Sequence, residues 1–316
     1  MARPGRRGRA LVNAALGLDI GGSKTMAVRS EDGVVVAEAR SGSANIASVG
    51  MAEAGRQLDL ALERVGGHGV RFVCAGAAGA DTPEGRARLR DLLAERLPDA
   101  VIRIVHDSEL ILSAAGLDEG VALISGTGSV AWGRHGERTA RAGGWGYLLG
   151  DQGSGYWVAR EAVCRALARV DRGEPEDALG RALVAECGLR STEQLLDHFY
   201  NHTDRRYWAR RAHVVFDLAQ SGDPVCRGIV DDVVDDLTGL VGTVTDRLAC
   251  AGPVILAGGL AVNQPLLQQN LRRALAARGV GDLRVLDTDP VHGALRLAQR
   301  LSGRGPWARP GQATYP

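Results

Sequence analysis

Hydrophobic and polar positions alternate in short runs through the first forty residues. An apolar run at residues 14–18 leads into the pair Gly21-Gly22, and apolar positions alternate over 26–36, interrupted at Glu31-Asp32-Gly33. Period-two alternation broken by Gly and Asp is typical of strands joined by tight turns. The pattern therefore predicts three consecutive strands with a glycine turn after the first.

From residue 51 the pattern alternates between helix and strand. Apolar side chains recur at helical spacing, and each helical stretch is followed by a buried-looking strand. The second helix is expected to start at Asp81-Thr82-Pro83. The expected helices are 51–65, 83–97 and 108–115, and the expected strands between them are 70–75 and 102–107.

A second strand–glycine turn–strand unit begins at Val121. Its turn is Gly126-Thr-Gly-Ser129, and further strands are expected over 130–133 and 138–141. The two units predict an internal structural repeat, and hence two similar domains. The chain after Gly155 is expected to be mostly helical as far as Cys250. Later elements are expected at 253–257 (strand), 261–277 (helix, with Asn263 a possible cap), 284–286 (strand) and 289–298 (helix).

Composition limits the class of protein. The chain has 316 residues, 45% hydrophobic and 24% charged, with a net charge of +1. This balance is typical of a globular protein and gives no reason to expect nucleic acid or membrane partners. Its five cysteines form no C-x-x-C pair and are expected to be buried thiols of a cytoplasmic protein. The basic residues 1–9 and the stretch 302–316 are expected to be loose tails.

The first glycine turn is a candidate phosphate site. Backbone N–H groups of such turns hold phosphate oxygens, and Asp19 beside it suits a hydrated magnesium ion. The alternative is an ordinary hairpin turn with a capping Asp. A Walker P-loop is disfavoured because Ser23 separates Gly22 from Lys24 and a strand follows instead of a helix. The pair His198 and His202 lacks the Glu of H-E-x-x-H, which disfavours zinc.

Four motifs in order carry a resemblance to a known family. They are Leu18-Asp-Ile-Gly-Gly-Ser-Lys-Thr25, Ile124-Ser-Gly-Thr-Gly-Ser129, Gly143-Gly-Trp-Gly146 with Gly150-Asp-Gln-Gly-Ser154, and Leu256-Ala-Gly-Gly259. Over roughly 16–298 the chain resembles the N-acetylglucosamine kinase branch of the sugar kinase, Hsp70 and actin superfamily, which includes the BadF/BadG/BcrA/BcrD ATPases. Within that branch it looks most like actinobacterial glucosamine kinases.

The resemblance implies an α/β fold of two RNase H-like (actin/hexokinase-type) domains flanking a nucleotide and sugar cleft. The first domain would span 1–117, joined by a C-terminal helix at 290–301. The second would span 118–289 with a helical insertion, followed by a loose tail at 302–316. The family also suggests a cytoplasmic homodimer that uses ATP and Mg²⁺.

The resemblance also implies roles for individual residues. Asp107 would be the catalytic base, and Asp19 would hold magnesium through water. The ATP-binding residues would be Gly21, Gly22, Ser23, Lys24, Thr25, Gly126, Thr127, Gly128, Ser129, Gly258, Gly259 and Asn263. The sugar-binding residues would be Asn45, Asp107, Glu109, Thr127, Gly144 and Asp151.

The stretch Asp107-Ser-Glu109 bears on the substrate. A second acid after the base could pair with the ammonium group of glucosamine, with Asp151 as a further partner. Alternatively, Glu109 faces solvent, Asp107 caps the helix from Ser108, and Asp151 caps a turn. The expected reaction is ATP-dependent phosphorylation of the 6-hydroxyl of glucosamine. The alternatives are an N-acetylglucosamine kinase, a BadF-type ATPase and a non-enzymatic sugar-responsive regulator.

Overall fold

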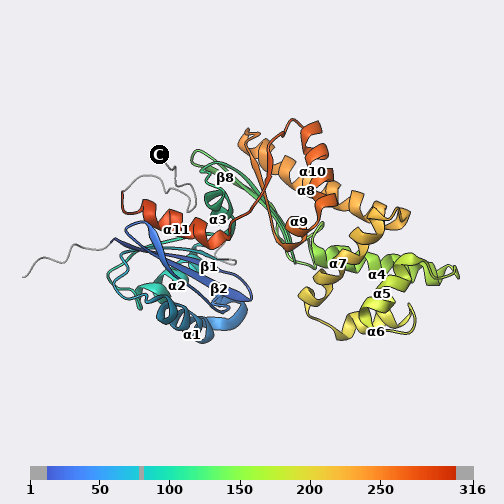
Figure 1. Ribbon diagram of the computed structural model, residues 1–316, viewed down its shortest axis with the longest axis horizontal. Coiled ribbons are helices and arrows are strands. Elements are labelled where there is room, and N and C mark those ends of the chain that lie inside the picture. Colours follow the sequence, from blue (N-terminus) through green and yellow to red (C-terminus); the bar gives the residue numbers. More distant parts are fainter. Residues whose placement is uncertain (1–12, 78–81, 304–316) are drawn as a thin grey trace, which may run out of the picture. The chain divides into compact units, whose positions relative to one another are not determined.

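The computed structural model describes residues 13–77 and 82–303 (Figure 1). Contacts divide the chain into unit 1, residues 1–116 with 288–316, and unit 2, residues 117–287. The sequence placed the divisions at 117/118 and 289/290, and the contacts place them at 116/117 and 287/288. The basic start, most of the expected C-terminal tail, and Asp81 lie outside the described residues.

Unit 1 contains one five-stranded sheet in the order β3-β2-β1-β4-β5. Strand β1 pairs antiparallel with β2 and parallel with β4. The elements are β1 (Ala14–Ile20), β2 (Lys24–Glu31), β3 (Val34–Gly42), α1 (Ile46–Val65), β4 (Phe72–Ala77), α2 (Pro83–Ala94), β5 (Val101–His106), α3 (Asp107–Ala114) and α11 (Pro290–Arg300).

Helix α1 starts five residues earlier than the sequence predicts. Asn45 caps it by accepting from the Ala47 amide, but Gly50 then leaves the helical region with φ 78°. Only glycine adopts such a conformation without strain. The expected start at Met51 is therefore the start of the regular part, after the kink.

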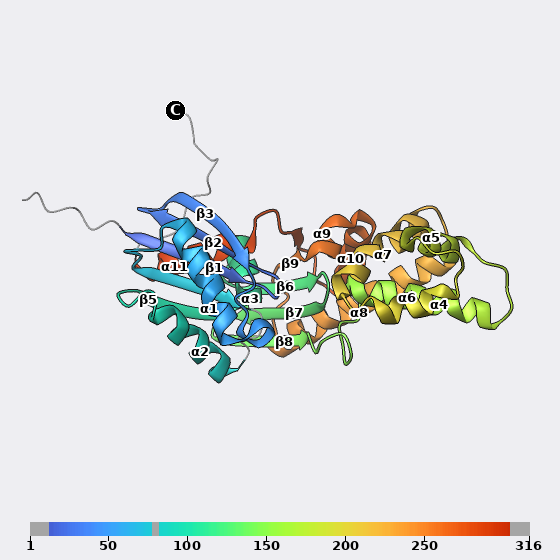
Figure 2. The ribbon, with the colours of Figure 1, turned by 90° about the horizontal axis from the view of Figure 1, so that it is seen from below.

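The sheet of unit 1 buries both faces. Leu16, Leu18 and Ile20 of β1 belong to the cluster that also includes Leu58 of α1 and Leu93 of α2. The residues of the other face join a second cluster with α3 and α11. The two helix pairs lie on opposite sides of the strands in Figure 1, and Figure 2 shows α1 in front of them. Alternate residues of a strand point to opposite faces, which explains the near-continuous apolar run of β1.

Helix α11 comes from the far end of the chain and packs directly on β1. A Cβ added to Gly17 would lie 2.3 Å from the Leu295 amide nitrogen, and one added to Gly293 would lie 2.0 Å from the Leu110 carbonyl oxygen. These approaches require residues without side chains. The sequence predicts that the last helix returns to the first domain. These contacts show α11 packed on β1 and α3 of unit 1.

Unit 2 repeats the strand order of unit 1. Its sheet, β10-β9-β6-β7-β8, again has a strand that pairs antiparallel with the next strand and parallel with a later one. The strands are β6 (Gly120–Ser125), β7 (Ser129–His135), β8 (Arg138–Gly143), β9 (Val254–Ala257) and β10 (Leu283–Val285). The structural repeat predicted from the two glycine turns, and the expected fold class, are confirmed.

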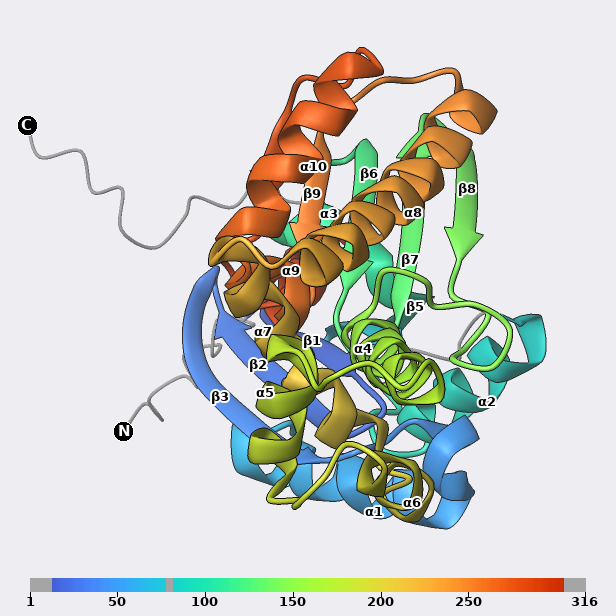
Figure 3. The same ribbon diagram turned by 90° about the vertical axis from the view of Figure 1, so that its right-hand side faces the viewer.

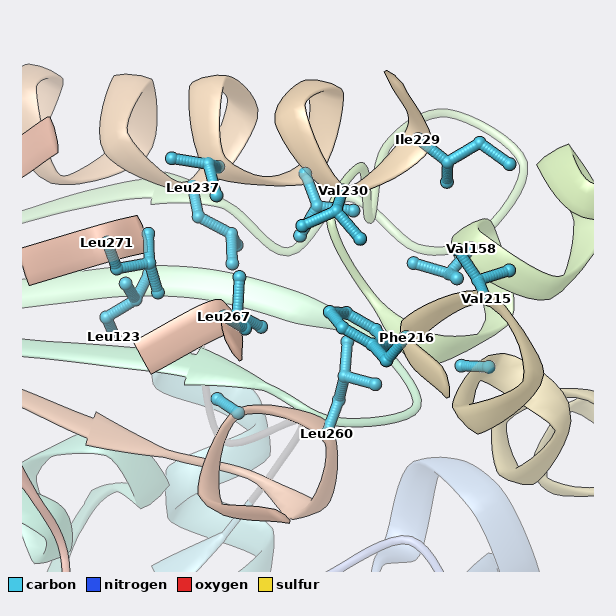
Figure 4. Packing of buried hydrophobic residues seen from close by; sticks show 14 of the residues in the cluster. Leu123, Val158, Val215, Phe216, Ile229, Val230, Leu237, Leu260, Leu267 and Leu271 are labelled. Carbon is cyan, nitrogen blue, oxygen red and sulfur yellow. The ribbon is translucent and has the colours of Figure 1, made fainter. Parts of the chain in front are cut away.

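The helices of unit 2 confirm the expected helical region after Gly155. They are α4 (Gly155–Asp171), α5 (Ala178–Cys187), α6 (Gln194–Asn201), α7 (Arg205–Gln220), α8 (Pro224–Leu248), α9 (Gly259–Asn263) and α10 (Pro265–Ala277). Helix α8 runs across β6, β7 and β8 (Figure 3). Phe216 of α7 is fully buried in the same cluster as Leu260 and Leu267 (Figure 4).

The single helix predicted over 261–277 is wrong. The chain forms α9 and then α10, separated at Gln264, whose backbone is extended (φ −117°, ψ 91°). The next residue is Pro265, and a proline disfavours helical backbone in the residue before it. Pro265 itself occupies the first turn of α10, as expected. Among the described residues, no helix combines the length and the apolar composition that a membrane span requires.

Candidate active site

The turn between β1 and β2 is open at its tip. The Gly21 amide donates to the Lys24 carbonyl at 3.0 Å, which closes the turn. Gly22 and Ser23 are exposed, and a Cβ added to Gly22 would meet nothing within 4 Å. Its geometry leaves room for an anion at the tip, which is what a phosphate turn needs.

The loop before α1 is tied to this turn. Thr25 is fully buried and its Oγ1 accepts from the Ala44 amide at 3.0 Å, while Ser43 Oγ donates to the Gly21 carbonyl at 2.9 Å. Asn45 follows and caps α1 through Oδ1. Among the described residues its Nδ2 has no recorded acceptor. The Thr25 oxygen thus supports the loop that carries Asn45.

Asp19 ends β1 beside the turn, and its surroundings oppose its charge. Burial, then the charges of Asp107 and Asp289, raise its pKa to about 7, while Lys24 lowers it. From the sequence, Asp19 and Asp107 were expected in one site, but Asp289 was not. Asp289 caps α11 by accepting from the Val291 amide at 3.3 Å, and packing of α11 on β1 is what brings it in.

Asp19, Asp107 and Asp289 repel one another when they are charged, and a divalent cation would relieve this repulsion. Burial, and then the like charges of Asp107 and Asp289, raise the pKa of Asp19. Among the described residues, no three His, Cys, Asp or Glu side chains are grouped closely enough to hold a metal directly. Magnesium commonly keeps several waters and takes one or two carboxylates. Asp19 is suited to hold such a hydrated ion.

Asp107 is the first residue of α3, directly after β5. Burial opposes its charge, but hydrogen bonds and charge from His106, with further hydrogen bonds from Ser108, lower its pKa below the usual value. His106 Nδ1 lies 3.0 Å from Asp107 Oδ1 and 3.1 Å from the Ser108 amide nitrogen. A protonated His106 donates to the carboxylate, and a neutral one caps the helix. Asp107 is therefore ionised at neutral pH and able to accept a proton.

Glu109 has a protein partner. Its side chain is buried, and Oε1 accepts from Arg103 Nη2 of β5 at 2.5 Å. A buried carboxylate that is already paired with a guanidinium gains little from a second cation. The solvent-facing alternative does not hold, and an ammonium group of a sugar would have to compete with Arg103.

The second turn, between β6 and β7, is fixed by the loop that follows β8. The Gly126 amide donates to the Gly128 carbonyl at 2.9 Å, and the Gly155 amide donates to the Gly126 carbonyl at 2.7 Å. Ser129 Oγ donates to the Gln152 carbonyl at 2.6 Å. The turn is thus anchored by residues at the start of α4.

Gly144 and Asp151, expected to hold the sugar, both contact the second turn. The Gly144 amide donates to the Ser129 carbonyl at 2.9 Å, and Asp151 Oδ1 lies 3.4 Å from the Ser129 amide nitrogen. Asp151 is buried with φ 62°, and burial raises its pKa despite the Ser129 amide. A Cβ at Gly128 would lie 2.9 Å from Asp151 Oδ2. The structure brings these residues together at Ser129.

The glycines after β9 pack on the second turn. Gly258 has φ 93°, and a Cβ there would lie 2.4 Å from the Ser125 carbonyl oxygen. Asn263 Nδ2 donates to the Gly259 carbonyl at 2.7 Å. Gly259 and Asn263 border a cavity of about 410 Å³. Its lining is Gly126, Thr127, Arg206, Ala209, Arg210, His213, Gly259, Leu260, Asn263 and Gln264.

A second cavity, of about 280 Å³, lies in unit 1. It is bordered by the residues around Asn45, by the end of β4 and by the first turns of α2; the polar lining residues are Asn45, Thr82, Glu84 and Arg88. Sequence reasoning missed the residues of α2 and α7 that line the two cavities. The only available signal was helical spacing, such as Arg206 and Arg210 four residues apart.

Two units with this strand order and a glycine turn in each define the two-domain sugar kinase and actin class of folds. A family model for the BadF/BadG/BcrA/BcrD ATPase family matches residues 16–298. The chain belongs to this family, as the order of its four motifs predicted.

Two curated relatives are kinases of amino sugars. An N-acetylmuramic acid/N-acetylglucosamine kinase from Clostridium acetobutylicum is 32% identical over 274 residues, covering 82% of this chain and 89% of the relative. An N-acetyl-D-glucosamine kinase from Dictyostelium discoideum is 27% identical, covering 72% of this chain and 75% of the relative.

Solved structures share the fold at lower identity. A proposed N-acetylglucosamine kinase from Chromobacterium violaceum superposes with a TM-score of 0.71 at 23% identity, covering 92% of this chain and 100% of that one. A ROK family glucokinase from Streptomyces griseus, in complex with glucose and AMPPNP, gives a TM-score of 0.57 at 17% identity with 91% and 100% coverage.

Proposed function

We propose that the protein is an ATP-dependent amino-sugar kinase that phosphorylates the 6-hydroxyl of an N-acetylated hexosamine. The observation that carries the proposal is the ionised Asp107 next to Asp19 and the open turn of unit 1. The names of the two curated relatives support the substrate class. The ATPase family supports ATP as the donor.

The chemistry asks little of the protein beyond positioning and a proton acceptor. Asp107 accepts the proton of the sugar hydroxyl while the hydroxyl oxygen bonds to the γ-phosphorus and ADP leaves. The glycine turns hold phosphate oxygens through backbone N–H groups. Asp19 would hold hydrated Mg²⁺, which when bound neutralises phosphate charge. His106 and Ser108 keep Asp107 ionised before the proton arrives.

The acetylated substrate is preferred over glucosamine for two reasons. Both curated relatives carry N-acetylglucosamine in their names. Glu109, the residue expected to meet an ammonium group, is paired with Arg103. The side-chain amide of Asn45 carries no charge, and its Nδ2 donors suit a neutral oxygen of the sugar. A charged donor would be the match for a carboxylate.

A panel assay tests the proposal. Initial rates with ATP and Mg²⁺ are measured for N-acetylglucosamine, N-acetylmuramic acid, glucosamine and glucose, with ADP release coupled to a dye or NADH readout. We expect the highest kcat/KM with an N-acetylated sugar. Preference for glucosamine would refute the acetylated assignment, and no turnover of any sugar would refute the kinase. Sedimentation of the same sample tests the expected homodimer.

N-acetylmuramic acid is a second candidate because of Arg88. This side chain borders the cavity that Asn45 lines, and among the described residues it has no recorded acid partner. N-acetylmuramic acid carries a carboxylate that N-acetylglucosamine lacks, and a guanidinium pairs well with a carboxylate. Arg88→Gln should lower kcat/KM for the acid while sparing N-acetylglucosamine. Arg90→Gln, an exposed change on the same helix outside the cavity lining, is the matched control.

A further inference from the structure

Helix α7 presents a cationic face to the cavity of unit 2. Arg206, Arg210 and His213 stand four and three residues apart, the spacing that places side chains on one face of a helix. All three line the 410 Å³ cavity, and the lining also includes Gly126 and Thr127 of the second turn. None of the residues lining it is an Asp or Glu. The lining of this cavity therefore includes two guanidinium groups and no carboxylate.

The neighbouring arginines of α7 are already engaged. The Arg205 guanidinium lies 5.0 Å from the centroid of the Tyr147 ring. Arg211 lies 3.4 Å from the centroid of the Tyr207 ring and donates to the Tyr207 carbonyl at 2.8 Å. In contrast, no side-chain hydrogen bond or ion pair to a described residue is recorded for Arg206 or Arg210.

His213 is held in place within this face. Its Nδ1 lies 2.8 Å from the Arg210 carbonyl oxygen, and its Nε2 lies 3.8 Å from Glu186 Oε2. Among the described residues, Arg206 and Arg210 thus have no anion beside them, whereas His213 lies near Glu186. A site with two such guanidinium groups and a glycine turn suits an anion with several oxygens.

We propose that Arg206 and Arg210 bind the phosphates of the nucleotide donor in the cavity that the glycine turn of unit 2 also lines. The proposal rests on the proposed function, because it takes the donor to be a nucleotide. A guanidinium offers paired N–H donors that match phosphate oxygens. The helical insertion of unit 2 then supplies phosphate contacts in addition to the backbone N–H groups of the turns.

Binding of ligands that differ in their number of phosphates tests this assignment. Equilibrium binding of ADP, AMP and adenosine is measured by calorimetry for the wild type, Arg206→Gln and Arg210→Gln. Loss of one charged hydrogen bond corresponds to a weakening of about 10- to 100-fold. We expect ADP to weaken by that factor in each variant, AMP by less, and adenosine to be unaffected. The KM for ATP should rise while the KM for the sugar stays level.

Controls separate charge at the site from charge in general. Arg272→Gln removes the same charge from an exposed position on α10 outside the cavity lining, and ADP binding should stay at the wild-type level. Arg210→Lys keeps the charge but loses the fork and should recover part of the ADP affinity. Thermal melting confirms that each variant is folded.

Three results would overturn the inference. Equal weakening of adenosine and ADP would place the guanidinium groups on the base, by stacking, instead of on the phosphates. Unchanged ADP binding in both arginine variants, with normal wild-type affinity, would remove them from the donor site and leave the kinase proposal intact. A wild-type protein that binds none of the three ligands would refute the proposed function itself.

Discussion

The sheets of the two units have the same strand order but differ in the strand that leads into each glycine turn. In unit 1 the β1–β2 ladder ends with Ile20 opposite Thr25, and in unit 2 the β6–β7 ladder ends with Ser125 opposite Ser129. The residue before the last pair is Asp19 in unit 1 and Ile124 in unit 2. The scaffold is repeated, whereas the carboxylate occurs only once.

The two turns share their means of support. Thr25 in unit 1 and Ser129 in unit 2 are buried hydroxyls that bond to a following loop, through Ala44 and Gln152 respectively. The difference therefore lies in charge. Unit 1 gathers three acids around its turn, and unit 2 places two arginines beside its own. On the proposed function, unit 1 would supply the proton acceptor and the metal ligand, and unit 2 the arginines that contact the donor.

The largest effect is expected from Asp107 in unit 1. Asp107→Asn keeps the shape of the side chain but removes the proton acceptor, so kcat should fall by about 10²- to 10⁴-fold. ADP and sugar binding should be nearly unchanged, measured by calorimetry. A variant that keeps more than about a tenth of the wild-type kcat would exclude Asp107 as the base.

The second largest effect is the dependence of folding stability on pH that Asp19 causes. Its folded pKa of about 7 lies above the ordinary value of 3.8, so the folded protein retains a proton that the unfolded chain releases between these values. Stability therefore falls as pH rises from about 4 to about 7, by up to about 4 kcal/mol. Asp107 acts in the opposite direction, but at lower pH, because its pKa is lowered.

Urea unfolding in EDTA between pH 4.5 and 8 measures this dependence. In Asp19→Asn the fall in unfolding free energy should be much smaller than in the wild type, and the variant should be the more stable protein at pH 8. Ile124→Asn at the corresponding place in unit 2 should leave the pH dependence unchanged. A wild-type curve as flat as that of Asp19→Asn would contradict the raised pKa.

Packing in unit 1 gives an effect of a few kcal/mol. Gly17→Ala would place a Cβ 2.3 Å from the backbone of α11, so β1 and α11 must separate. Overpacking of this kind costs about 1–3 kcal/mol. Chemical denaturation should show the loss, and Gly228→Ala on α8, where a Cβ meets nothing within 4 Å, is the control. Equal stability of the two variants would mean that α11 does not pack on Gly17.

The smallest effects are expected from removing the buried hydroxyl that supports each turn. The loss of stability should be similar in the two turns. Thr25→Val and Ser129→Ala each remove a buried hydroxyl that bonds to a loop, at a cost of about 1–3 kcal/mol where a partner is left unpaired. Their unfolding free energies, measured side by side, should fall by comparable amounts. A large loss in one turn and none in the other would show that the loops do not support the turns alike.

The sequence was sufficient to predict the repeat because strand–turn–strand patterns are local. Gly21 and Gly126 directly follow the first strand of each unit and so mark the turns, and Asp19 lies two residues before the first of them. The pairing of Glu109 with Arg103 was not predictable, because it depends on how α3 rotates against β5. Asp289 and Arg210 were missed for a similar reason: only tertiary packing brings them to a site formed by residues far away in the sequence.

The placement of α11 has a consequence for biosynthesis. The sheet of unit 1 is complete once residue 106 has been made, but the helix that covers Ala15, Val28 and Cys74 begins at residue 290. At about 5–20 residues per second, translation takes roughly 10–40 s to supply it. During that interval one apolar face of the nascent sheet is uncovered, while unit 2 is continuous in sequence and can fold first. A ribosome-bound chaperone would therefore meet this protein mainly at its N-terminal half.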